Sequence, residues 1–141
     1  MKAKVKKNEA DLPLMTAGFI VTGMEFDPNE CSRHFEVEAT QVRTKGEIQP
    51  RSKCPAPHSS WSVTTKWARF DSTDAVLRLI LDVIWPKRAQ IRGFAVKNKL
   101  KITIVVNIRG GLGKRNFLYE FSPRMVTQIA YFRAELGLDV Y

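Results

Sequence analysis

The sequence predicts a single α+β domain, with an antiparallel or mixed sheet of four or five strands and three or four helices packed on one face. Short apolar stretches that alternate with polar residues are separated by segments with the helical period. Hairpin and helix signals are mixed, without the series of buried strands that is typical of a parallel βαβ fold. The 141 residues, 44% of them hydrophobic, suit one domain with one core.

The first elements follow from local patterns. Residues 1–13 are polar and lysine-rich, so we expect a flexible basic tail before a domain spanning 14–141. Residues 16–24 are apolar and β-branched, which predicts a buried strand. Asp27 is a preferred N-cap and is followed by a proline, so a short helix should run from there to near Phe35.

A long irregular segment then separates this helix from the next strand. Val42 suits a brief strand, Lys45-Gly46 predicts a turn, and three prolines predict a long loop at 49–60. Residues 61–68 alternate large apolar with polar side chains, as in a half-buried strand.

The middle of the chain predicts two consecutive helices. Residues 71–74 provide the caps of an amphipathic helix that ends at Pro86. A second helical piece should run from Lys87 to about Lys97, with Asn98 as a left-handed terminus.

The last third predicts a hairpin, a helix and a short strand. Residues 100–108 alternate cleanly, and a glycine-rich turn should lead to an antiparallel partner at 116–121. Ser122-Pro123 is a helix start, Gly137 is the expected residue just past its end, and 138–141 suit a short terminal strand.

The apolar residues near the front predict a core strand rather than a signal peptide. Glu9 and Asp11 interrupt the charge pattern of a signal peptide, and no A-x-A cleavage site follows. No apolar run approaches the roughly 20 residues that a membrane-spanning helix requires. We therefore expect a soluble, cytoplasmic protein with no membrane partner.

The cysteines and histidines predict no metal site. Cys31 and His34 stand three positions apart on the first helix, and Cys54 and His58 form a second loose pair. All four could make a zinc site only if the long loop folded back onto the helix. Without CxxC spacing, two buried or half-buried thiols are favoured, and a disulfide is the alternative.

Other catalytic patterns are equally weak. His58 adjoins two serines, but neighbours on an extended segment point in opposite directions, and no G-x-S-x-G motif is present. Residues 110–114 lack the serine or threonine and the following helix of a phosphate-binding loop. No two carboxylates form a supported acid/base couple. The sequence predicts no catalytic residue and no cofactor, and hence a protein that is not an enzyme.

The net charge of +9 is concentrated in one stretch. Residues 1–82 carry 12 basic and 11 acidic side chains, and residues 120–141 carry 2 and 3. Residues 83–119 carry no acid, and their nine basic side chains are the candidate partner-binding residues: Lys87, Arg88, Arg92, Lys97, Lys99, Lys101, Arg109, Lys114 and Arg115.

Helix and strand geometry should gather these charges into a basic surface. Arg88 and Arg92 lie one turn apart, away from the apolar stripe of their helix. Lys99, Lys101 and Arg109 share the strand face opposite the apolar one. Such a surface would attract an acidic partner, although solubility alone is the other interpretation. Nucleic acid is disfavoured because no aromatic residue is clearly interleaved with the charges.

Several features, in a fixed order, resemble a known family. They are Phe19 in the opening strand, the Asp27-Pro28 helix start, Thr44-Lys45-Gly46-Glu47, Trp61-Ser62, the helix ending at Pro86, and the closing Leu136-Gly137-Leu138-Asp139-Val140-Tyr141. Across nearly the whole chain the sequence resembles small bacterial domains catalogued as a domain of unknown function, number 4279. The lysine-rich front and the loop at 50–60 depart from that pattern. The resemblance implies a bacterial, cytoplasmic, stand-alone domain and carries no catalytic residues.

The sequence hypothesis is a non-enzymatic protein-binding module. Small solitary bacterial domains are often immunity proteins that occlude a toxin, which is an analogy at the level of class. In such a binding module, residues 83–119 would form the surface that docks a toxin or another acidic protein partner. The alternative is a nucleic-acid-binding domain.

Overall fold

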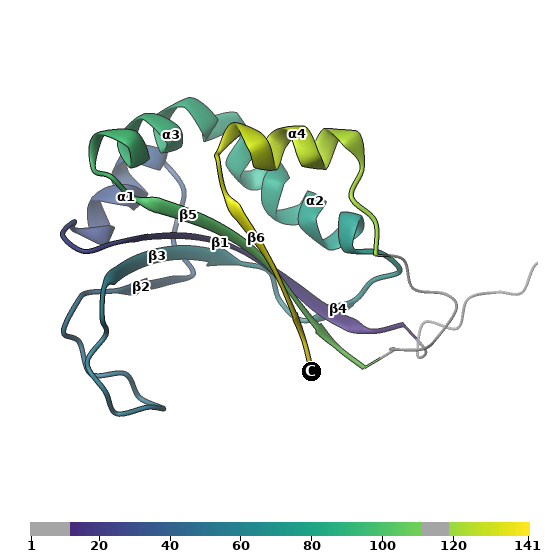
Figure 1. The fold of residues 1–141 in the computed structure, drawn as a ribbon, viewed down its shortest axis with the longest axis horizontal. Coiled ribbons are helices and arrows are strands. Elements are labelled where there is room, and N and C mark those ends of the chain that lie inside the picture. Colours follow the sequence, from purple (N-terminus) through teal and green to yellow (C-terminus); the bar gives the residue numbers. More distant parts are fainter. Residues whose placement is uncertain (1–11, 111–118) are drawn as a thin grey trace, which may run out of the picture.

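The computed structural model describes residues 12–110 and 119–141, which form a curved sheet with helices on one face (Figure 1). The strands are β1 (Leu14–Gly23), β2 (Gln41–Arg43), β3 (Ser59–Thr64), β4 (Ala68–Arg69), β5 (Lys101–Arg109) and β6 (Glu135–Val140). The helices are α1 (Pro28–Phe35), α2 (Thr73–Ile84), α3 (Arg88–Lys97) and α4 (Pro123–Tyr131), with a 3₁₀ turn, Trp85–Lys87, between α2 and α3.

The sheet is mixed, with β1 at its centre. The strand order is β2-β3-β1-β5-β6, and β4 pairs with the start of β1. Within the described residues β6 alone is parallel to its neighbour, and the other pairs are antiparallel. The predicted α+β class, with a mixed sheet and helices on one face, is confirmed. No described helix has the length and apolar character to cross a membrane.

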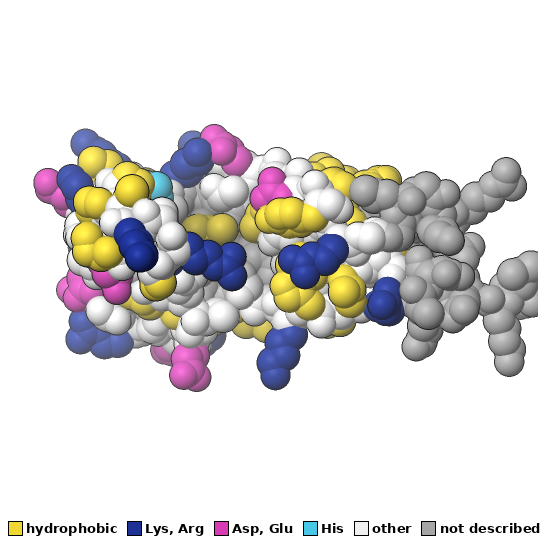
Figure 2. Space-filling view, turned by 90° about the horizontal axis from the view of Figure 1, so that it is seen from below, with side chains coloured by type: hydrophobic (Ala, Val, Ile, Leu, Met, Phe, Trp, Pro, Cys, Tyr) yellow, Lys and Arg dark blue, Asp and Glu magenta, His cyan; other side chains and the backbone are white. Residues whose placement is uncertain are grey.

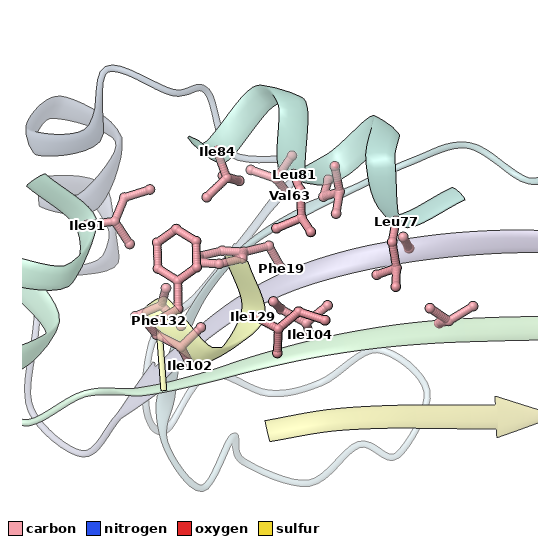
Figure 3. Packing of buried hydrophobic residues seen from close by; sticks show 14 of the residues in the cluster. Phe19, Val63, Leu77, Leu81, Ile84, Ile91, Ile102, Ile104, Ile129 and Phe132 are labelled. Atoms are coloured by element: carbon pink, nitrogen blue, oxygen red, sulfur yellow. The ribbon is translucent and has the colours of Figure 1, made fainter. Parts of the chain in front are cut away.

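One apolar core fills the space between the sheet and the helices (Figure 3). Every second residue of β5 is buried, as the alternation predicted. The buried side chains come from the sheet and from all four helices, and include Phe19, Trp61, Leu77, Leu81, Ile84, Ile91, Ile104, Ile129 and Phe132. Among the described residues, no helix lies over the opposite face of the sheet (Figure 1).

The three helix starts predicted from capping residues are confirmed. The side chains of Asp27, Ser72 and Ser122 each accept a hydrogen bond from a backbone N–H in the first turn of α1, α2 and α4, respectively. These caps depend on neighbours in the sequence, which is why local patterns locate them correctly.

A polar joint ties the first turn of α2 to the start of α4. The backbone N–H of Ser122 donates to Asp74 Oδ1 over 2.9 Å, and Arg78 donates to the other carboxylate oxygen over 3.1 Å. The Thr73 hydroxyl donates to the carbonyl of Glu120 over 2.7 Å. Burial acts to raise the pKa of Asp74, but the hydrogen bonds from Ser122 and Arg78 outweigh it and hold that pKa below its usual range.

The predicted hairpin after β5 is wrong. Both edges of β5 are occupied, one by β1 and the other by β6, so no edge remains for residues 116–121. Of that segment, 116–118 lie outside the described residues, and Glu120 and Phe121 are not in a strand. The terminal strand takes the place instead. It is longer than predicted and pairs in parallel, with α4 as the crossover that such a pair requires.

Two predicted helix ends are also corrected. Asn98 has φ −101°, and the left-handed residue after α3 is Lys99, with φ 54°. The turn extends one residue because the Asn98 side chain donates to the Phe94 carbonyl over 2.9 Å. Gly137 lies inside β6, and the left-handed residue after α4 is Arg133, with φ 51°.

The strand predicted at 61–68 is interrupted. It divides into β3 and β4 because the side chain of Thr65 replaces a backbone group in the ladder. The Thr65 hydroxyl accepts the backbone N–H of Ala17 over 2.9 Å, and the Thr65 N–H donates to the Ala17 carbonyl over 2.9 Å.

Replacing Asp74 by asparagine tests the polar joint. Asp74→Asn should lower the free energy of unfolding at neutral pH by about 1–3 kcal/mol, because charge-assisted hydrogen bonds to a buried group are lost. The folded-state pKa is depressed, so the stabilisation is present above the unfolded pKa of about 3.9 and is lost as pH falls through the folded value. Urea denaturation of both proteins should therefore show a gap that closes below about pH 4. A gap that persists unchanged in acid would contradict this role.

Candidate binding site

The seven candidate cations that the structure describes do not lie on one continuous face. Lys114 and Arg115 lie outside the described residues. Lys101 and Arg109 share a face of β5, as predicted, but stand at its two ends, about 26 Å apart. On the helix-free side, lysine and arginine side chains are spread out, with polar and apolar side chains between them (Figure 2).

Several of these cations are already engaged. Lys87 Nζ lies 2.7 Å from Glu36 Oε2, and this contact lowers the pKa of the Glu36 carboxyl. Three arginines lie over aromatic rings, at 4.5 to 5.9 Å from the ring centroids: Arg88 over Trp85, Arg92 over Tyr131, and Arg109 over both Trp67 and Tyr141. Aromatic residues are thus interleaved with the arginines, which the sequence analysis did not anticipate.

Three of the predicted cations meet at one cavity. Arg92, Lys99 and Lys101 line a hollow of about 260 Å³ where α3 ends and β5 begins. Arg133 and Glu135, which follow α4, complete its charged rim. The apolar side chains that line it are Ala95, Val96, Leu100, Ile102 and Phe132. We call these ten residues the basic pocket.

The pocket arises because α3 and α4 end in the same way. The N–H of Leu100 donates to the Ala95 carbonyl over 2.8 Å, and the N–H of Ala134 donates to the Ile129 carbonyl over 3.4 Å. These bonds close a turn in which the preceding residue, Lys99 or Arg133, is left-handed. Each turn leads directly into β5 or β6, and because those strands pair in parallel, both turns lie at the same edge.

Lys99 and Arg133 carry a charge that is favourable at a helix end, but their backbone conformation there is unfavourable. A helix C-terminus carries partial negative charge and favours a cation nearby. The left-handed region, however, costs a residue with a Cβ about 1–2 kcal/mol, which is why glycine is usual there. Lys99 and Arg133 are therefore placed at positions where a glycine would relieve strain.

The rim holds more positive than negative charge. Lys101 Nζ lies 2.9 Å from Glu135 Oε2, and both side chains are more than half exposed. Within the described residues, Arg92, Lys99 and Arg133 have no carboxylate at ion-pair distance. One apolar hollow is thus bordered by three cations without an acidic partner in the described chain.

Lys99 and Lys101 also border a second hollow, of about 330 Å³, together with Thr22, Met24 and His58. This places His58 beside two of the basic residues. The two lysines therefore line both the pocket at the helix ends and this second hollow.

The cysteines are free thiols in different settings. Cys31 is buried, and burial together with the charges of Asp27 and Glu30 raises the pKa of its thiol to about 12. Cys54 is exposed, contrary to the expectation that both would be at least half-buried. The ring of His34 packs against that of Phe94, with 4.9 Å between the ring centroids and a tilt of 42°. Within the described ranges, no group of three His, Cys, Asp or Glu could hold a metal ion.

Among the cations of the pocket, Arg133 is the one that sequence reasoning missed. Its spacing from Val126 and Ile129 fits the stripe of a helix that begins at Pro123, so the sequence pattern gives no sign of a turn there. Because α4 ends at Tyr131, Arg133 lies beyond the helix. The absence of a glycine before residue 137 concealed the turn, since a left-handed arginine is uncommon.

Glycine substitutions test whether Lys99 and Arg133 are strained. Lys99→Gly and Arg133→Gly should each raise the free energy of unfolding by about 1 kcal/mol, measured by urea denaturation at high salt, where the lost helix-end charge is screened. Lys97→Gly is the matched control and should lower it by about 1 kcal/mol, because Lys97 is helical. If Lys99→Gly destabilised the protein as much as Lys97→Gly, the strain would be refuted.

The comparisons with known proteins agree with the resemblance stated from the sequence. No curated protein and no solved structure matches the chain significantly. A family model described as Domain of unknown function (DUF4279) matches residues 13–141, which include every residue of the basic pocket. The match covers nearly the whole chain, and the chain belongs to this family.

Proposed function

We propose that the protein is a non-enzymatic binding module that docks an acidic protein partner at the basic pocket. The carrying observation is that Arg92, Lys99 and Arg133 border one hollow without an acidic partner among the described residues. An immunity-type inhibitor that occludes a toxin would be one form of such a module.

Electrostatics favours an acidic partner in two ways. Unpaired cations raise the local positive potential and accelerate encounter with negatively charged surfaces. Once the partner is docked, ion pairs at the interface lose water, and charge-assisted hydrogen bonds there are stronger than exposed ones. The partner's carboxylates would supply the charges that the described rim lacks.

Binding is favoured over catalysis because neither Cys31 nor Ser59 is set up as a nucleophile among the described residues. The raised pKa of Cys31 keeps its thiol protonated at neutral pH. The hydroxyl of Ser59 is buried and accepts the backbone N–H of Lys45 over 2.9 Å.

One observation favours nucleic acid as a second candidate. At the far end of β5, Arg109 lies between Trp67 and Tyr141, which are 42% and 68% exposed. Exposed rings beside an arginine can stack on bases. Binding of random single-stranded RNA at low salt that is lost in a Trp67→Ala variant would support this candidate.

Charge reversal tests the proposed function. The triple variant Arg92→Glu, Lys99→Glu, Arg133→Glu should bind a polyglutamate chain about tenfold more weakly or worse, because exposed ion pairs contribute about 0.5 kcal/mol each. The measurement is fluorescence anisotropy at low salt.

The control reverses three exposed cations outside the pocket, Arg33, Arg51 and Lys66, and changes the net charge equally. It should bind polyglutamate nearly as well as the original chain. Equal losses in the two triple variants would mean that only net charge matters, and the docking site would be wrong.

A further inference from the structure

We propose, resting on the function above, that the basic pocket anchors one large apolar side chain of the acidic partner. Carboxylates on residues next to that side chain would pair with Arg92, Lys99 and Arg133. The partner's recognition element is thus an apolar residue flanked by acidic ones, rather than a run of acidic residues alone.

The floor of the pocket supports an apolar occupant. Ala95, Ile102 and Phe132 line it and belong to the hydrophobic core, with exposed fractions of 5%, 5% and 4%. At its lip, Val96 is 69% exposed. A hollow floored by core side chains gains free energy when an apolar group displaces its water.

The size of the pocket indicates a single side chain. Its volume of about 260 Å³ is below the roughly 300–1,000 Å³ of pockets that hold small-molecule ligands. Protein interfaces commonly place one large side chain in such a hollow, and these anchors carry most of the binding energy.

The rim requires the anchor to be flanked by carboxylates. Lys101 and Glu135 neutralise each other, which leaves Arg92 and the two left-handed residues to be paired. A carboxylate in the hollow itself would lose its water against apolar side chains, whereas an apolar residue with neutral neighbours would leave the cations uncompensated. Only an apolar side chain flanked by carboxylates suits both the apolar floor and the cationic rim.

The rim is also preorganised. The ring of Tyr131 lies 5.0 Å from the Arg92 guanidinium carbon, and this contact restrains the arginine. The left-handed turns fix the backbone at Lys99 and Arg133. Less conformational freedom is then lost when the partner binds.

Matched peptides test the inference on the full chain. The probes are a short acidic peptide with a central phenylalanine, the same peptide with a central glycine, and a phenylalanine peptide with glutamine in place of each acid. The acidic phenylalanine peptide should bind about tenfold more tightly than either of the others, because it alone has both the anchor and the charges. In an NMR titration, its largest amide shifts should fall at Ala95, Leu100, Ile102 and Phe132.

A cavity-filling variant adds a second readout. Ala95→Leu extends a side chain into the hollow and leaves the rim unchanged. It should abolish the preference for phenylalanine over glycine while retaining the affinity for the acidic glycine peptide. Ala89→Leu, at an exposed position of the same helix, is the control and should keep the preference. If Ala95→Leu does not fold, the peptide series on the original chain decides.

The outcomes separate this inference from the function on which it rests. Equal affinity for the acidic phenylalanine and glycine peptides, still lost on charge reversal, would overturn the anchor and leave the acidic docking site standing. No binding of either acidic peptide to the original chain would overturn both.

Discussion

The parallel pairing of β6 with β5 determines where the charged residues of this protein meet. Parallel neighbours need a crossover, and α4 provides it, so α3 and α4 both end at the edge where these strands begin. Lys99 and Arg133, far apart in the chain, therefore occupy equivalent turns. An antiparallel hairpin in place of β6 would have left Lys99 without this neighbour, and the apolar hollow would have lost Phe132 from its wall.

Lys99 and Arg133 combine backbone strain with positive charge at the edge where β5 and β6 begin. A cation after a helix is favoured by the helix dipole, but the left-handed backbone disfavours any residue with a Cβ. Two such residues in one pocket are notable because backbone strain of this kind is concentrated at functional sites. Together with the arginine held against Tyr131, they make a rim whose positions are set by the fold rather than by flexible loops.

The parts of this fold that sequence could predict are those set by near neighbours. Asp27, Ser72 and Ser122 cap helices through contacts within three residues, and the alternation in β5 predicts its buried face. Strand partners are chosen by packing across the whole sheet, so a glycine-rich turn misleadingly suggested a hairpin. Of the pocket, sequence located Arg92, Lys99 and Lys101 as charges but could not show that they meet. It missed Arg133, because the end of α4 depends on tertiary context.

The hydrogen bond between Asp74 and Ser122 fixes the N-terminal end of α4 against α2. The nine residues of the helix span about 14 Å, so this joint and Arg133 lie at opposite ends of α4. A change at this joint, which touches no residue of the pocket, would therefore shift the rim at the other end of the helix.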